Sequence, residues 1–249
     1  MDPFELIFQD RYEEAIKVYT RRINQASEPD EFDLGGRGMA FLCLGKYDEA
    51  LRDLVKADDS RRNKLIGSPG CIEDIAITLW MKGEKAEAIK TARSAVDGLI
   101  KGEIEYADLA GGVGPGLLLW YMAVSLGDSD NKSYALKYLK QLSKKSKIKY
   151  WPGPLAKFVL GSLIFQDVLK EIGKSSNINK LKKKSRKDML LRRRLLSTIF
   201  YQGVKKLDEG DNESFSRAMV EITELKNTAI ELEWYLARYE KNKIYNKEN

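Results

Sequence analysis

The feature that most constrains the fold of this chain is a short motif that returns along it. Its copies read QDRYEEAI, GKYDEAL, GEKAEAI and GDNESFS, and they begin at residues 9, 45, 83 and 210. The first two copies are evenly spaced, because Tyr12 and Tyr47 are 35 residues apart and so are Ala15 and Ala50. Repetition at an interval of this size is typical of helix pairs that stack into an array. We therefore expect stacked pairs of helices.

Each part of the motif has a structural explanation. The recurring alanine is small enough to let the two helices of a pair approach closely. The recurring glycine, at residues 45, 83 and 210, allows the positive φ that ends a helix. The adjacent acids then fall in the first turn of the next helix, where the helix dipole favours them; they are Glu13, Glu14, Asp48 and Glu49. We interpret these carboxylates as helix-start residues and not as a catalytic acid–base pair.

The remainder of the sequence also has a helical pattern. Segments rich in Ala, Leu, Lys and Glu recur, prolines number only six, and no Asn-Gly turn separates alternating strands. The helix-breaking stretches fall between these segments, at residues 27–30, 67–70, 111–116, 127–131, 151–154 and 208–212. The sequence therefore predicts an all-α fold of antiparallel helix pairs joined by short turns.

The second copy resembles the tetratricopeptide repeat, a helix–turn–helix of about 34 residues with the pattern W-x2-L-G-x2-Y, then A-x3-F, then P. Leu34 stands at the tryptophan position, Gly38 at the glycine and Phe41 at the tyrosine. Gly45 ends the first helix, and the second helix is marked by Tyr47, Ala50, Leu54 and Ala57.

The other copies match this pattern less fully. The first keeps Tyr12, Ala15, Tyr19 and Pro29 but has lost most of its leading helix. The third keeps Ala76, Leu79, Gly83, Ala88, Ala92 and Ala95. The fourth has Trp120, Gly127, Ala135 and Tyr138, with about three extra residues expected in its turn. The fifth begins a helix at Pro154 and has Leu160 and Gly161 at the Leu-Gly positions, and the sixth has Gly203, Gly210, Phe215 and Met219.

The resemblance implies a single domain over residues 1–249, built as a short right-handed α-α superhelix of about five to six helix pairs. The amphipathic, tyrosine-rich segment 227–245 is expected to form a C-terminal capping helix. The basic segment 174–188 is expected to form a mobile loop between the fifth and sixth pairs.

In the resembled family the first helix of each pair lines a concave groove that binds another protein. The positions that would line it here are Met39, Leu42, Cys43, Glu73, Ile77, Trp80, Met81, Tyr121, Val124, Phe158, Phe165 and Phe200. Trp80 and Tyr121 matter most, because large aromatic side chains make anchors for a bound segment. The alternative is that the C-terminal helix or the next repeat covers them.

The chain contains no histidine, and this argues against an enzyme. Ser–His and Cys–His nucleophile pairs and histidine-ligated metals are excluded, and the usual general base is missing. Cys43 and Cys71 alone cannot supply the four ligands of a structural zinc site. We expect no catalytic residues, no cofactor and no metal.

Charge is distributed unevenly along the chain. Residues 1–100 hold 15 basic and 19 acidic side chains, a net charge of −4. Residues 132–206 hold 21 basic and 3 acidic side chains, a net charge of +18. The basic belt at 142–194 comprises Lys144, Lys145, Lys147, Lys149, Lys182, Lys183, Lys184, Arg186, Lys187, Arg192, Arg193 and Arg194. It can bind an acidic protein surface, or nucleic-acid phosphates with bases stacked on Tyr150 and Trp151, or it can be solvated surface without a partner.

The location follows from the segments that the sequence lacks. The acidic N-terminus has no basic region followed by an apolar run, no stretch reaches 18 apolar residues, and two cysteines suit a reducing compartment. We expect a cytoplasmic protein without membrane contact that binds and sequesters a partner protein. The most specific hypothesis is a bacterial immunity protein that neutralises a toxin domain. The alternative is a nucleic-acid-binding or regulatory adaptor protein that uses the basic belt.

Overall fold

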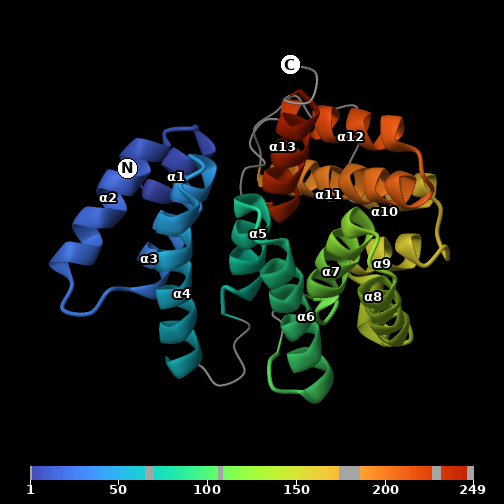
Figure 1. Cartoon of the computed structure of the whole chain (residues 1–249), viewed down its shortest axis with the longest axis horizontal. Coiled ribbons are helices and arrows are strands. Elements are labelled where there is room, and N and C mark those ends of the chain that lie inside the picture. The colour runs from blue at the N-terminus through green and yellow to red at the C-terminus, as the bar shows by residue number, and fades with distance from the viewer. Residues whose placement is uncertain (1, 65–69, 106–108, 174–185, 226–230, 246–249) are drawn as a thin grey trace. The chain divides into compact units, whose positions relative to one another are not determined.

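The computed structural model describes residues 2–64, 70–105, 109–173, 186–225 and 231–245 (Figure 1). These residues form helices and turns with no strand among them, so the predicted all-α class is confirmed. Two compact units form, one from residues 1–106 and one from residues 107–249. The single domain expected over the whole chain stays a prediction.

The first unit contains three successive helix pairs. Its helices are α1 (Pro3–Phe8), α2 (Tyr12–Gln25), α3 (Glu31–Cys43), α4 (Tyr47–Lys64), α5 (Ile72–Lys82) and α6 (Lys85–Lys101). The pairs are α1 with α2, α3 with α4 and α5 with α6, and they join through contacts of α2 with α3 and of α4 with α5. The six residues of α1 match the shortened leading helix expected for the first copy.

The second unit contains the remaining helices. They are α7 (Val113–Leu126), α8 (Ser129–Leu142), the 3-10 helix η1 (Ser146–Lys149), α9 (Gly153–Val159), α10 (Phe165–Gly173), α11 (Arg186–Asp208), α12 (Asn212–Glu224) and α13 (Leu232–Tyr245). The helix expected within 227–245 is α13, which packs against α11 and α12. Of the loop expected at 174–188, residues 174–185 lie outside the described residues and 186–188 begin α11.

The turns inside the helix pairs share one geometry. The glycines that precede α4, α6, α8 and α12 have positive φ, and each helix begins two residues later; they are Gly45, Gly83, Gly127 and Gly210. The backbone N–H of the residue after each glycine donates to the carbonyl five residues earlier, as Lys46 does to Phe41 at 3.0 Å. This bond gives a partner to one of the free carbonyls at the end of the preceding helix. The predicted role of the glycines at 45, 83 and 210 is confirmed.

The first copy of the motif has an aspartate in place of this glycine. Asp10 has a φ of 58°, and among the described residues it alone adopts a positive φ without being glycine. The Tyr12 hydroxyl donates to the Asp10 carboxylate at 2.6 Å, and α2 begins at Tyr12. Aspartate tolerates this left-handed conformation better than most residues, so the turn forms without glycine.

The fourth copy departs from its predicted turn. We expected about three extra residues between Gly127 and the next helix, but α8 already begins at Ser129. Asp128 caps the helix by accepting from the backbone N–H of Asn131 at 2.9 Å, so the extra residues form the first turn of α8. The side chain of Asp128 is the physical reason, because it satisfies a free donor at the helix start.

The fifth copy also departs from its prediction. Leu160 and Gly161 were expected inside a helix, but α9 ends at Val159 and Gly161 has a φ of 76°. The helix α9 is only seven residues long, and α11 contacts both α7 and α9. In a linear repeat array each unit contacts only its neighbours, so the second unit departs from that arrangement.

Glycines at the helix crossings let the helices of a pair approach closely. A Cβ added to Gly38 would lie 2.9 Å from Cγ of Leu54 on the facing helix. A Cβ on Gly116 would lie 2.7 Å from Cδ1 of Tyr138, and Gly203 is similarly close to α12. Close packing of α3 on α4, of α7 on α8 and of α11 on α12 therefore depends on these glycines.

Candidate functional site

The predicted groove residues are not exposed. Those that are buried are Leu42, Cys43, Ile77, Trp80, Tyr121, Phe158 and Phe200. Those that are half-buried are Met39, Glu73, Met81, Val124 and Phe165. Most of these positions therefore contribute to the core instead of presenting a side chain to a partner.

The two aromatic anchors of the predicted groove are covered. Trp80 is 1% exposed, and the ammonium of Lys85 lies 3.7 Å from the centre of its ring. Tyr121 is 0% exposed, its ring packs edge-to-face on Phe200 at 5.1 Å, and its hydroxyl donates to Glu240 of α13 at 2.9 Å. Of the two alternatives that the sequence left open, both residues are covered, and α13 contributes to the cover of Tyr121.

Part of the basic belt does form an exposed surface. On α8, Lys137 and Lys140 lie on the same exposed stripe as Lys144 just beyond the helix, because their spacing of three and four residues follows the helix turn. The opposite face of α8 buries Ala135, Tyr138, Leu139 and Leu142. Packing of that face in the core therefore turns the lysine stripe to solvent.

The lysines continue from α8 into η1. We define the α8–η1 lysine surface as the six exposed side chains Lys137, Lys140, Lys144, Lys145, Lys147 and Lys149. No ion pair joins any of the six to an acid among the described residues, and residues 131–166 contain neither Asp nor Glu. Many other lysines are paired; for example, Lys82 is within 2.7 Å of Asp48. This surface is therefore a concentration of positive charge that no ion pair within the described part of the chain neutralises.

Two aromatic residues adjoin the surface. Tyr150 is 47% exposed, and the ammonium of Lys149 lies 5.2 Å from its ring centre. The guanidinium of Arg194 lies 5.5 Å from the ring of Trp151. This contact brings α11 beside the segment that follows η1, so two parts of the predicted belt that are distant in sequence meet.

The arginines and the remaining lysines of the belt contribute differently. Arg193 pairs with Glu231, and Arg192, Arg193 and Arg194 are all half-buried. Arg186 and Lys187 lie in the first turn of α11, and their side chains are outside the described residues. Lys182, Lys183 and Lys184 also lie outside the described residues. Among the belt side chains that the structure describes, the exposed ones are therefore all lysines.

Sequence reasoning missed a buried ion pair in the first unit. Arg37 of α3 donates to both oxygens of Asp53 on α4, at 2.6 and 2.8 Å, and to the hydroxyl of Thr20 on α2 at 3.1 Å. Asp53 is 3% exposed. The pair joins three helices and serves the fold. Asp53 lies three residues after the buried Ala50, and an acid on an apolar helix face is the signal that could have revealed it.

Two further acids have raised pKa values. Burial raises the pKa of Asp74 to about 6, although the charge of Arg61 opposes the shift. Burial raises the pKa of Glu233 to about 7, with a further increase from the charge of Glu231 and opposing hydrogen bonds from Ser197 and Tyr201. The two acids belong to different units.

The described residues contain no group of three or more acids and cysteines placed to hold a metal ion. None of their helices combines the length and apolar character needed to cross a bilayer. No protein-family model matches the sequence, and a search of curated proteins finds no significantly similar relative.

Proposed function

We propose that this chain is a non-enzymatic protein-binding module that sequesters an acidic partner protein through the α8–η1 lysine surface. The observation that carries the proposal is six exposed lysines that form no ion pair with an acid in the described part of the chain. Like charges at helical spacing repel one another, so this arrangement does not serve the stability of α8. An acidic partner would neutralise the repulsion and would be attracted to the surface over a distance of about 10 Å.

An acidic protein suits this surface better than a nucleic acid. Arginine recognises phosphates and bases with a planar pair of donors, but Arg193 already pairs with Glu231 and Arg194 lies over Trp151. The Trp151 ring, on which a base would stack, is thus already in contact with Arg194. Lysines that act as separate point charges suit carboxylates distributed over a protein surface.

We further propose that the helix pairs of the first unit are tetratricopeptide-like and belong to a short α-α superhelix. Three consecutive pairs, glycine-ended turns and the close approach of α3 to α4 at Gly38 support this proposal. Helical arrays of this kind offer extended surfaces to other proteins, although the fold alone does not name the partner.

The most specific form of the proposal is a cytoplasmic immunity protein of a bacterium, which would cover the active surface of a toxin domain. The strong local charge supports it, because opposite charges speed capture of a toxin before it acts. If several unrelated housekeeping proteins were recovered with the chain from its host, this form of the proposal would be excluded.

The experiment compares two triple variants that change the net charge equally. The first is Lys137→Glu, Lys140→Glu and Lys144→Glu. The control is Lys17→Glu, Lys46→Glu and Lys56→Glu, which reverses three exposed lysines of the first unit. Each protein is used to recover partners from host lysate, and the recovered partner is purified and titrated by calorimetry.

We expect wild type and control to bind the same acidic protein, and the first variant to bind it at least about tenfold more weakly, since each exposed pair contributes up to about 1 kcal/mol. Equal binding by both variants would refute the proposal. Loss of the interaction after nuclease treatment would instead favour the nucleic-acid alternative.

A further inference from the structure

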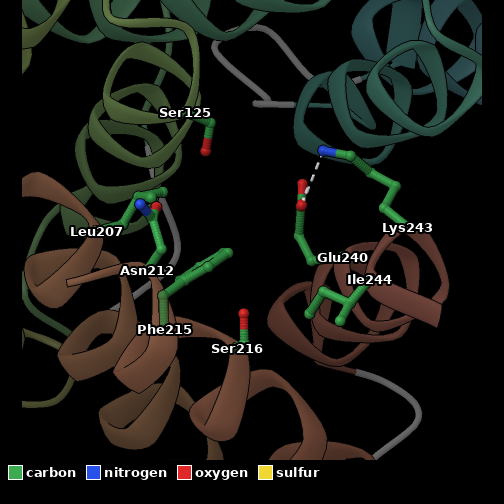
Figure 2. A pocket seen from close by; sticks show the side chains of 8 residues that line it. All are labelled: Ser125, Leu207, Asn212, Phe215, Ser216, Glu240, Lys243 and Ile244. Carbon is green, nitrogen blue, oxygen red and sulfur yellow. Dashed lines mark hydrogen bonds and ion pairs between the residues drawn. The ribbon is translucent and has the colours of Figure 1, made fainter. Parts of the chain in front are cut away.

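The second unit contains a pocket of about 520 Å³ whose lining shares no residue with the lysine surface. Its lining comes from α7, α11, α12 and α13, and the side chains are Ser125, Leu207, Asn212, Phe215, Ser216, Glu240, Lys243 and Ile244 (Figure 2). This volume is in the range of small-molecule sites in proteins, which is roughly 300–1,000 Å³. The pocket is therefore large enough for a ligand of one or two rings.

Helical spacing places the lining side chains on common faces. Asn212, Phe215 and Ser216 are three and four residues apart on α12. Glu240, Lys243 and Ile244 have the same spacing on α13. Figure 2 shows that Ser125, Phe215 and Ser216 point into the space that these helices and α7 enclose.

The hydroxyl of Ser125 is the most informative group in the pocket. Its Oγ is buried and has no hydrogen-bond partner among the described residues. A serine inside a helix commonly bonds to the carbonyl four residues earlier, and Ser125 does not. A buried polar group without a partner is costly, so the hydroxyl is suited to a bond with a bound molecule.

Glu240 supplies acceptors beside this hydroxyl. The residue is 6% exposed, and its carboxylate accepts from the Tyr121 hydroxyl and from the Lys243 ammonium, each at 2.9 Å. A carboxylate has about four lone-pair sites, so it can accept further bonds from a ligand. Tyr121 and Lys243 also hold the carboxylate in position.

The charges of the lining decide the chemical class of the ligand. Among the described residues of the lining, Lys243 is the one cationic side chain and is already paired with Glu240, so these residues are neutral overall and offer nothing to balance a phosphate. The polar groups of Ser125, Asn212 and Ser216 disfavour a purely apolar molecule. The walls supplied by Leu207, Phe215 and Ile244 favour a molecule with an apolar ring face.

We propose that this pocket binds a neutral small molecule rich in hydroxyl or amide groups, of the size of a monosaccharide or a nucleoside. The Ser125 hydroxyl forms a hydrogen bond with this molecule, and the Glu240 carboxylate accepts hydrogen bonds from its hydroxyls. The apolar walls contact its ring. This site is separate from the lysine surface, so it does not depend on the proposed protein partner.

The test measures ligand binding by calorimetry and saturation-transfer NMR. The probes are glucose, N-acetylglucosamine, uridine and adenosine at about 10 mM, well above the 1 mM dissociation constant of a weak site. Glucose 6-phosphate and adenosine monophosphate are the charged counterparts. The variants are Ser125→Ala and Ser216→Ala, with Ser133→Ala on the exposed face of α8 as the matched control.

We expect at least one neutral probe to bind, each pocket variant to weaken binding about tenfold, and the control to leave it unchanged. Ser125→Ala should at the same time retain or raise the melting temperature, because it removes a buried hydroxyl without a partner. Retained folding with lost binding distinguishes a ligand-binding role from a structural one.

Three results would overturn the proposal. The first is that no neutral probe binds to the wild-type protein. The second is that a probe binds equally to wild type and to Ser125→Ala. The third is that the phosphorylated counterparts bind more tightly than the neutral probes, which would mean that the pocket selects anions.

Discussion

Two glycines in α3, three residues apart, give the sharpest test of the helix packing. Replacing either one by alanine should gain about 1 kcal/mol of intrinsic helix propensity. A Cβ on Gly35 would have no neighbour within 4 Å, so Gly35→Ala should stabilise the first unit by that amount. A Cβ on Gly38 would lie 2.9 Å from Cγ of Leu54 and 3.3 Å from the carbonyl oxygen of Ala50.

The crowding at Gly38 should outweigh the gain in propensity. Overpacking of this kind costs about 1–3 kcal/mol, so Gly38→Ala should be neutral or destabilising by up to about 2 kcal/mol. The propensity terms of the two variants cancel, and their difference of about 1–3 kcal/mol reports the crowding alone.

Urea unfolding followed by circular dichroism measures this difference, and hydrogen exchange of α3 shows which unit responds. If Gly38→Ala stabilised the protein as much as Gly35→Ala, the close approach of α3 to α4 would be refuted.

Two further predictions concern buried charges of the first unit. Arg37→Ala should lower the free energy of unfolding by about 3–5 kcal/mol, because it leaves the Asp53 carboxylate buried without its partner. The double variant with Asp53→Ala should lose less of this free energy. Urea unfolding measures both values. Asp74 has a folded pKa of about 6, above its ordinary 3.8, so the folded protein holds a proton that the unfolded chain releases between about pH 4 and pH 6. Stability should therefore decrease as pH rises through that interval, and melting curves of Asp74→Asn should lack this part of the decrease. A decrease that persists unchanged in Asp74→Asn would contradict the assignment.

The helix boundaries at the glycine-ended turns could be predicted because their causes are local. Positive φ at Gly45, Gly83 and Gly210 ends a helix whatever lies around it, and acids in the next turn interact with the dipole of their own helix. The prediction was wrong where another local signal dominated. Asp128 starts α8 earlier than the repeat pattern indicated, and Gly161 ends α9 sooner.

The candidate site was predictable only in part. The lysines of η1 could be identified because their excess is a property of composition, and Lys137 and Lys140 extend the same surface on α8. Whether the groove anchors are exposed or covered could not be predicted, because the periodic pattern marks apolar positions without showing what covers them. Tyr121 has the same spacing whether a partner or α13 lies over it.

The sequence by itself determined the helical class, the glycine-ended turns and the excess of positive charge, since each depends on residues close together in the chain. Only the tertiary structure decided which side chains are buried. Glu240 reaches Tyr121 across 119 positions, and that contact covers the aromatic anchor and shapes the pocket beside Ser125. Contacts over such separations depend on how helices pack, and helical periodicity does not encode which helix packs on which.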